Sequence, residues 1–277
     1  MRFEKWQALA NDYVIVERSE LPQEPTPELV RALCDRHTGI GADGVLVLAP
    51  PDEPGFVARL RIFNPDGSEA ELSGNGARQA ILYLRRAGWT DARQFSIQTA
   101  AGEIRPTILS DTTCRVDMGR ASLRQTGEVH GFRFQHLVIG NPQTAIHVAD
   151  PGTLEAFDLA ALGPPIETDA QFPQRTNVSW FTTLDNTTIR ARIFERGVGE
   201  TASSGTGACG AAIAHVLRGG DSPVTVKLDG GELEVEVGED LHVDLTGWAV
   251  RVFSGEIDPG FGVAGASGGA NGITEGG

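Results

Sequence analysis

The sequence predicts an α+β protein made of two similar domains, and three observations support this fold class. The stretch "RLRIFNPDGSEAELSGNGARQAILYLRRAGW", which begins at Arg59, is matched without a gap by "RARIFERGVGETASSGTGACGAAIAHVLRGG", which begins at Arg190. Stretches with the alternation of strands outnumber those with helical spacing. Each copy also has a glycine-rich loop directly before its helix. A repeat that covers strand, loop and helix predicts two domains with one fold.

Each copy predicts the same elements in the same order. The alternating run that starts each copy is typical of a strand. A polar loop follows and ends in the pattern S-G-x-G, with Ser73 in the first copy and Ser204 in the second, an offset of 131 residues. Apolar residues at helical spacing then predict a helix that ends in arginine and glycine, Arg86 and Gly88 in the first copy. This ending suits the negative end of a helix and a left-handed C-cap.

The match continues on both sides of the repeat. "LANDYVIV" carries Asn11, "IGNPQTAIHV" carries Asn141, and "TAAGEIRPTI" aligns with "LDGGELEVEV", with small changes of offset that loop insertions would produce. We therefore expect a first half over residues 1–117 and a second over 118–255, with a final strand that can return to the first domain. Residues 256–277 are rich in glycine and lack periodicity, so we expect a disordered tail there.

Charge and composition argue against several classes of protein. The formal net charge is −14 and the pI is near 4.8, which argues against nucleic acid or an anionic membrane as the main partner. No apolar run is long enough to span a bilayer, and the first residues lack the apolar core of a signal peptide. Three cysteines at unrelated spacings form neither a disulfide framework nor a zinc site, so a reducing cytoplasm is expected.

The two glycine loops define the candidate site. A helix N-terminus preceded by glycine presents unpaired N–H groups and the positive end of the helix dipole. Two such N-termini that face each other would hold one carboxylate from both sides. Ser73 and Ser204 would then lie on opposite faces of the bound molecule, which suits removal of a proton from one face of a carbon and its return to the other. The alternative is that both serines only cap their helices.

Phosphate-loop and metal chemistry are not supported. Neither glycine loop is followed by the lysine of a P-loop. The six histidines are scattered without ligand spacing, so we expect no metal and no organic cofactor. Asp43 and Asp66 stand in turn contexts and are expected to shape those turns, and the alternative is contact with the amine of the ligand.

Seven motifs in order, spread over nearly the whole chain, resemble the diaminopimelate epimerase family. They read "ALANDYVIVE", "RHTGIGADGVLVL", "RIFNPDGSEAELSGNGAR", "GNPQTAIHV", "RTNVSWF", "FERGVGETASSGTGAC" and "TGWAVRVFSGEI". The resemblance implies two pseudo-symmetric domains, each a mixed sheet or barrel around a central helix. It also implies a cytoplasmic, cofactor-independent homodimer. Such an enzyme interconverts LL- and meso-diaminopimelate by two-base proton transfer at Cα, in the biosynthesis of lysine and cell-wall precursors.

The resemblance also assigns binding residues. Gly74, Asn75, Gly205 and Thr206 would hold the carboxylate and amine at the reacting centre, and Asn11, Asn64, Asn141, Asn177, Glu195 and Arg196 would line the rest of the cleft. Arg196 suits a fork for the distal carboxylate of a diamino diacid, and its alternative is an ion pair with Glu195 or Glu200. The asparagines also have an alternative as turn residues. The matching repeat positions of Asn11 and Asn141 favour a function.

The chain departs from the family at both catalytic positions. The family's bases are cysteines, whereas Ser73 and Ser204 stand there in this sequence. A thiol has a reference pKa of about 8.5, which a helix N-terminus lowers, but a hydroxyl is a far weaker acid and needs an adjacent base. Three further departures are Gln143 in place of a histidine, Ala10 in place of a glycine and Gln79 in place of a cysteine.

These departures leave three functions open. The protein can epimerise diaminopimelate with hydroxyl or water-mediated bases, act as an isomerase or racemase on a different small carboxylate substrate, or bind a ligand without turnover. Because almost every binding position is retained, the first function is favoured. Deliberate replacement of two cysteines would explain only Ser73 and Ser204, whereas divergence of a natural branch explains all the departures together.

Overall fold

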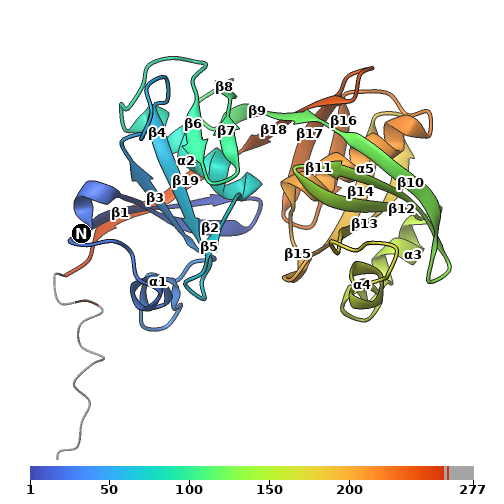
Figure 1. Ribbon diagram of the computed structural model, residues 1–277, viewed down its shortest axis with the longest axis horizontal. Helices are drawn as coiled ribbons and strands as arrows, with labels where there is room; N and C mark the ends of the chain where they lie inside the picture. Colours follow the sequence, from blue (N-terminus) through green and yellow to red (C-terminus); the bar gives the residue numbers. More distant parts are fainter. Residues whose placement is uncertain (259–260, 262–277) are drawn as a thin grey trace, which may run out of the picture.

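Two β-sheets lie side by side in the computed structural model of the chain, which describes residues 1–258 and 261 (Figure 1). The strands of the first sheet are β1 (Arg2–Ala8), β2 (Asn11–Glu17), β3 (Val45–Ala49), β4 (Ala58–Phe63), β5 (Glu69–Ala70), β6 (Ile97–Thr99), β7 (Gly102–Ile104) and β19 (Val250–Glu256). Their order is β19-β1-β2-β3-β4-β6-β7, with β5 paired to β4. This half also contains the 3-10 turn η1 (Arg18–Glu20) and the helices α1 (Pro27–Cys34) and α2 (Gly74–Arg86).

The second sheet contains the remaining strands. They are β8 (Pro106–Ile108), β9 (Thr113–Arg120), β10 (Ser122–Val129), β11 (Phe132–Ile139), β12 (Asn141–His147), β13 (Asn177–Asp185), β14 (Thr188–Glu195), β15 (Gly199–Thr201), β16 (Val224–Leu228), β17 (Gly231–Val237) and β18 (His242–Trp248). Their order is β10-β11-β12-β13-β14-β16-β17-β18-β9-β8, with β15 paired to β14. The helices of this half are α3 (Pro151–Glu155), α4 (Leu159–Glu167) and α5 (Gly205–Leu217).

The two sheets repeat one topology. In the first, β2 pairs in parallel with β3 and β4 in parallel with β6; in the second, the same relations join β12 to β13 and β14 to β16. The central helices α2 and α5 each have 13 residues and follow the equivalent short strands β5 and β15. The prediction of an α+β fold with two similar halves, each a mixed sheet around a central helix, is confirmed.

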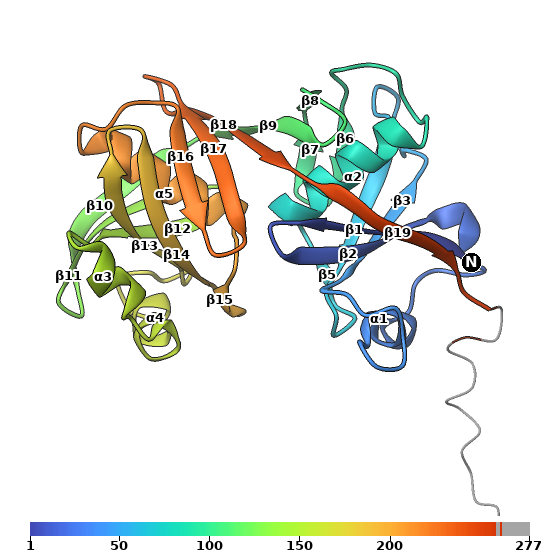
Figure 2. The same cartoon turned by 180° about the vertical axis from the view of Figure 1, so that it is seen from behind.

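The chain passes between the two sheets twice. It leaves the first sheet after β7 and joins the second through β8 and β9, and it returns from β18 into β19, which pairs with β1 (Figure 2). The expected boundary between residues 117 and 118 therefore falls inside β9. A disordered tail was expected over residues 256–277, but its first two residues are part of the fold. Glu256 ends β19, and the N–H of Ile257 donates to the carbonyl of Met1 at 2.9 Å. Residues 259–260 and 262–277 lie outside the described residues.

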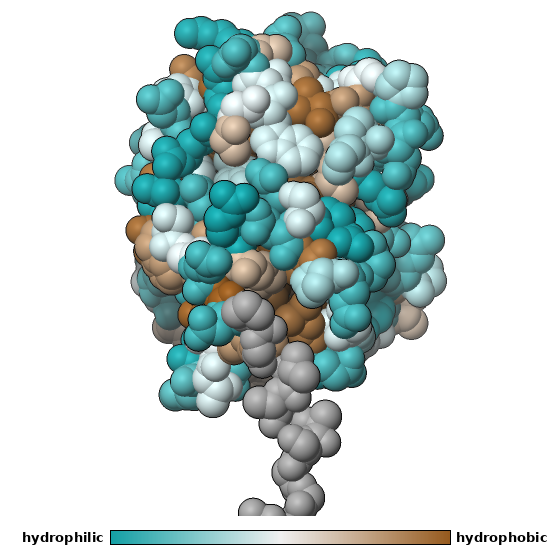
Figure 3. Space-filling view, turned by 90° about the vertical axis from the view of Figure 1, so that its left-hand side faces the viewer, coloured by the Kyte–Doolittle hydropathy of each residue, from teal (hydrophilic) through white to brown (hydrophobic). Residues whose placement is uncertain are grey.

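One apolar core cluster extends through both halves and includes buried residues of both central helices. Ile81 of α2 and Ile213 of α5 have no exposed surface, and both belong to this cluster. Helix α5 is rich in alanine and glycine, so strands approach it closely on several sides, β12, β13 and β17 foremost. The face of the first half shown in Figure 3 is mostly hydrophilic, with hydrophobic residues scattered over it. Among the described helices, none has the length and apolar character needed to cross a bilayer.

Candidate active site

Ser73 and Ser204 occupy equivalent positions at the starts of the two central helices. Both have extended backbone angles and act as N-caps: the Oγ of Ser73 accepts from the N–H of Gly76 at 3.1 Å, and the Oγ of Ser204 accepts from the N–H of Gly207 at 3.2 Å. The capping role expected from residue type is therefore present at both sites. It uses one lone pair of each hydroxyl and leaves the hydroxyl proton free for another partner.

The N-termini of α2 and α5 meet. A Cβ placed on Gly74 would lie 3.5 Å from the Cα of Gly205, and a Cβ placed on Gly205 would lie 3.1 Å from Leu245 Cδ2. The two helix starts are therefore within van der Waals distance of each other, and a side chain at Gly205 would also require Leu245 to shift. The facing arrangement expected from the sequence is thus present, and it brings two positive helix ends to one place.

Ser73 has a phenol as its second neighbour. The hydroxyl of Tyr13, on β2, donates to the Oγ of Ser73 at 3.2 Å. Burial raises the pKa of Tyr13 to about 12, despite the opposing effect of the hydrogen bond with Ser73, so the phenol remains a neutral donor at neutral pH. The sequence analysis did not identify Tyr13, because its place in an apolar strand offers no separate signal.

Ser204 has a carboxyl group as its second neighbour. Glu195, at the end of β14, is largely buried, and this burial raises the pKa of its carboxyl. The nearby Ser204 hydroxyl lowers the pKa of this carboxyl in part. The two serines therefore differ: two donors, Tyr13 and the Gly76 N–H, point at the Ser73 oxygen, whereas Ser204 has a carboxyl group nearby.

A buried polar chain joins the two halves next to the meeting helices. The Nδ2 of Asn75 donates to the Oγ of Ser203 at 2.8 Å, and Ser203 donates to the carbonyl of Leu9 at 3.0 Å. The Oδ1 of Asn75 accepts from Nη2 of Arg78, a fully buried arginine that the sequence analysis did not single out. Asn75 thus lies at the junction, but its amide is occupied by protein partners.

The equivalent residues Asn11 and Asn141 are each held by a glutamine. Nε2 of Gln79 donates to the carbonyl of Asn11 at 3.0 Å, and Nε2 of Gln143 donates to the Oδ1 of Asn141. The Nδ2 of Asn11 in turn donates to Asp43 at 3.0 Å, so Asp43 does more than shape a turn. Both glutamines keep a buried Oε1 without a partner in the described structure.

A second buried acid supports the loop after β14. The Oδ1 of Asn177 accepts from the N–H of Arg196 at 2.8 Å, and the Oε1 of Glu167 accepts from the N–H of Gly197 at 2.7 Å. Glu167 is 4% exposed, and Arg175 donates to the same oxygen. These bonds fix the backbone that carries Arg196. Glu167 stands in an apolar helix and was missed, because its partners come from another part of the chain.

The side chain of Arg196 is exposed and has no carboxylate partner among the residues with described positions. Its Nη1 donates to the carbonyl of Gln174 at 2.9 Å. The expected alternative, an ion pair with Glu195 or Glu200, is not formed, since Glu200 pairs with Arg192 at 2.5 Å. The guanidinium is therefore available to a ligand.

Asn64 and Thr206 complete the candidate set. Asn64 lies in the turn between β4 and β5, where its Nδ2 donates to Ser68 at 3.0 Å, as the turn interpretation expects. Thr206 lies next to the loop before Asn141, with its Cγ2 3.6 Å from a Cβ placed on Gly140. A binding role for either residue stays a prediction.

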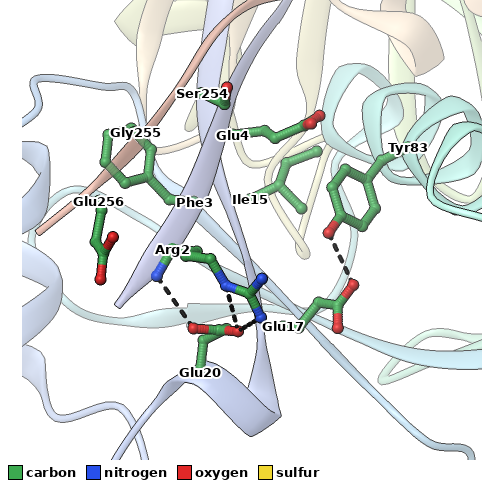
Figure 4. A pocket seen from close by; sticks show the side chains of 10 residues that line it. All are labelled: Arg2, Phe3, Glu4, Ile15, Glu17, Glu20, Tyr83, Ser254, Gly255 and Glu256. Carbon is green, nitrogen blue, oxygen red and sulfur yellow. Dashed lines mark hydrogen bonds and ion pairs between the residues drawn. The ribbon is translucent and has the colours of Figure 1, made fainter.

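Two other features lie outside this site. Asp117, His242 and Asp244, on β9 and β18, have potential ligand atoms within 4.8 Å of one another, and His242 pairs with Asp117 at 3.1 Å. A cavity of about 410 Å³ lies between the start of β1, β2 and β19 (Figure 4). Its lining is rich in glutamates, and Tyr83 donates to Glu17 in it at 2.9 Å. It adjoins the later part of α2, away from Ser73.

Asp12, beside this site, makes the stability of the fold depend on pH. Partial burial opposes its ionisation, but hydrogen bonds from Arg36 and Lys5 outweigh this and lower its pKa from 3.8 to about 2. The pKa of Asp12 in the folded state lies below its value of 3.8 in the unfolded chain. The stabilisation is therefore complete above pH 3.8 and is lost as pH falls toward 2. We expect the difference in unfolding free energy between wild type and Asp12→Asn, from urea titrations, to shrink over this range. A difference that is constant with pH would contradict this.

Comparisons with solved structures show which fold the chain has. A phenazine biosynthesis protein from Bacillus anthracis superimposes with a TM-score of 0.70 at 17% identity, covering 93% of this chain and 98% of that one. A probable proline racemase from Agrobacterium radiobacter, with bound carbonate, gives 0.67 at 15% identity, covering 94% and 95%. The fold is that of the epimerases and isomerases built from two similar halves.

Sequence comparison identifies the family. The family model "Diaminopimelate epimerase" matches residues 3–124 and 136–252, one segment largely in each half. A diaminopimelate epimerase from Pelotomaculum thermopropionicum is 39% identical over 280 residues, covering 92% of this chain and 98% of the relative. One from Magnetococcus marinus is 40% identical over 273 residues, covering 92% and 96%. The chain belongs to the diaminopimelate epimerase family, a family of PLP-independent isomerases, and the resemblance seen in the sequence is confirmed.

Proposed function

We propose that the protein interconverts LL- and meso-diaminopimelate by proton transfer at Cα between Ser73 and Ser204. The observation that carries this proposal is the contact between the N-termini of α2 and α5, with one hydroxyl at the start of each helix. The N–H groups at this point suit the α-carboxylate of an amino acid. The family membership of the chain supports the same substrate.

In one direction of the proposed reaction Ser204 is the base and Ser73 is the acid. Ser204 removes the Cα proton while its own hydroxyl proton passes to Glu195, whose buried carboxyl has a raised pKa and accepts a proton more readily than an exposed one. Ser73 donates its proton to the opposite face of Cα. The oxyanion that remains on Ser73 is stabilised by the Tyr13 hydroxyl and the Gly76 N–H. In the reverse direction the Ser73 oxyanion removes the Cα proton, and Ser204 donates its proton to Cα and recovers one from Glu195. Between turnovers in one direction, exchange with water removes the proton from Glu195 and returns one to Ser73.

The distal half of the substrate would be bound by the loop after β14. Arg196 has a guanidinium without an acidic partner in the described chain, and a bidentate pair with a carboxylate suits its fork. Asn11, Asn64, Asn141 and Asn177 are proposed to line the remaining cleft. The partner is thus a small amino acid, and the three unpaired cysteines are compatible with a reducing cytoplasm.

Proton NMR of LL-diaminopimelate with the purified protein in deuterated buffer tests this function. We expect the Cα–H signal to disappear while the meso isomer accumulates, and expect both changes to be lost in the double variant Ser73→Ala, Ser204→Ala. Exchange of a different amino acid, with diaminopimelate unchanged, would assign another substrate. Binding without exchange would mean that the protein is a non-catalytic member of the family.

We also propose that the protein is a homodimer through the free edge of β19. This strand ends the first sheet, and Val252 and Phe253 on it are 54% and 42% exposed. An edge strand with exposed apolar side chains is suited to pairing with a second copy. We expect sedimentation equilibrium to give twice the chain mass for wild type and the monomer mass for Phe253→Lys. A monomeric wild type at micromolar concentration would refute this proposal.

A further inference from the structure

Arg78 is a buried cation that the proposed mechanism does not use. It follows the glycine loop on α2, has no exposed surface, and keeps Nε and Nη1 without a hydrogen-bond partner in the described structure. Its Nη2 donates to Asn75. Burial lowers the pKa of Arg78 only to about 10, so the guanidinium stays charged at neutral pH.

The free end of Arg78 lies at the point where the two central helices meet. A Cβ placed on Gly74 and a Cβ placed on Gly205 would each be 3.8 Å from Nη1 of Arg78. The guanidinium is therefore equally close to the first residue of α2 and the first residue of α5. On its other side, a Cβ on Gly247 of β18 would lie 2.8 Å from Nε, so glycine there leaves the space that the side chain fills.

The charge of Arg78 has no carboxylate to balance it in the part of the chain that is described. The ionisable groups that influence its pKa are the thiols of Cys114 and Cys209, which burial keeps protonated, and no acid is among them. An unpaired buried charge opposes folding, because water no longer solvates it. The positive ends of two helices at the same place add to this cost. An anion bound there would compensate the charge of Arg78 and the positive ends of both helices.

We propose that Arg78 is a positioning residue for the substrate, whose buried charge holds a carboxylate at the meeting point of α2 and α5. The proposal rests on the proposed function for the natural anion, the α-carboxylate of an amino acid. In this proposal the charge of Arg78 makes the site prefer anionic over neutral ligands, and the N–H groups of the two helix N-termini contact the ligand.

The test compares three variants of the full chain with wild type. Arg78→Met removes the charge and keeps an unbranched side chain, and Arg78→Lys keeps the charge without the fork. Arg86→Met is the matched control, an arginine of the same helix whose side chain is 49% exposed. For each protein, calorimetric titration measures the affinity for meso-diaminopimelate and for inorganic sulfate, and thermal unfolding without ligand measures stability.

We expect Arg78→Met to bind both anions about tenfold more weakly or worse, equivalent to ~1.4 kcal/mol, with an unfolding temperature equal to or above that of wild type. Arg78→Lys should bind within a few-fold of wild type and Arg86→Met should bind as wild type does. A purely structural arginine gives the opposite pattern, a lower unfolding temperature with unchanged affinity, and this would overturn the proposal.

The remaining outcomes also decide the proposal. Binding of Arg78→Lys that is about tenfold or more weaker than that of wild type would show that shape matters and charge does not, and so would overturn the proposal. This comparison with wild type does not require Arg78→Met to fold. Wild type that binds sulfate but not meso-diaminopimelate would refute the proposed substrate, and the sulfate affinities would still decide the role of Arg78. Wild type that binds neither would overturn both.

Discussion

Replacing Ser73 and Ser204 together by cysteine should raise the rate of Cα–H exchange in diaminopimelate by about a hundredfold or more, the range in which general acid–base catalysis operates. The physical reason is acidity. Each helix N-terminus presents N–H groups and positive potential to the side chain that caps it, and these lower the pKa of a thiol into a usable range. A hydroxyl at the same place stays protonated, and Ser204 relies on Glu195 to accept its proton. Exchange in deuterated buffer, followed by NMR at pH 7 to 9, measures the change.

Single and neighbouring variants control this experiment. Ser73→Cys or Ser204→Cys alone leaves one hydroxyl, so each should give a smaller gain than the pair. Ser203→Cys places a thiol next to Ser204 in the same loop but on the Asn75 side, and should give none. If the double variant exchanges no faster than wild type, the two helix starts are not the site of proton transfer.

Replacing Arg196 by methionine should weaken the binding of meso-diaminopimelate by about a hundredfold, since a hydrogen-bonded charge pair contributes roughly 1.5–3 kcal/mol. Its backbone is held by Asn177 and the following residue by Glu167, and its guanidinium has no acidic partner in the described residues to lose. The fold should therefore keep its stability. Titration calorimetry measures the affinity, and thermal unfolding verifies the stability.

The choice of ligand makes this prediction specific. A diamino acid without the distal carboxylate should bind wild type and Arg196→Met equally, because the lost interaction concerns that group alone. Arg196→Lys should fall between the two, since lysine keeps the charge but not the fork. Arg124→Met, at an exposed position on β10, is the control. Equal weakening for both ligands would place Arg196 at the reacting centre or in the fold, and the distal role would be wrong.

Much of the fold could be predicted because the chain repeats itself. The ungapped match from Arg59 and from Arg190 predicts one strand, loop and helix twice, and the structure places β4 with α2 and β14 with α5 accordingly. The exchange of strands between the sheets was harder to predict. β9 joins the second sheet and β19 the first because of pairing partners far away in the chain, and strand periodicity does not identify a partner.

Some residues of the candidate site could also be predicted from local sequence, and others could not. Ser73 and Ser204 were found from local sequence, because an N-cap before glycine is a signal within a few residues. Tyr13 and Glu167 were missed, since each acts through a partner from another element: Ser73 lies 60 positions from Tyr13, and Gly197 lies 30 positions from Glu167. Arg78 was also overlooked, because on a helix a single arginine usually lies at the surface.

The sequence by itself determined the two-fold repeat, the helix starts with their serines, and membership of the diaminopimelate epimerase family. These are properties of short range, set by backbone propensity, periodicity and residue identity. Only the tertiary structure decided that the two helix starts touch, that Ser204 has an acid and Ser73 a phenol as neighbour, and that Arg78 lies uncompensated between them. Such facts depend on burial and on contacts between distant segments. The same hydroxyl or guanidinium has different chemistry once water is excluded from it.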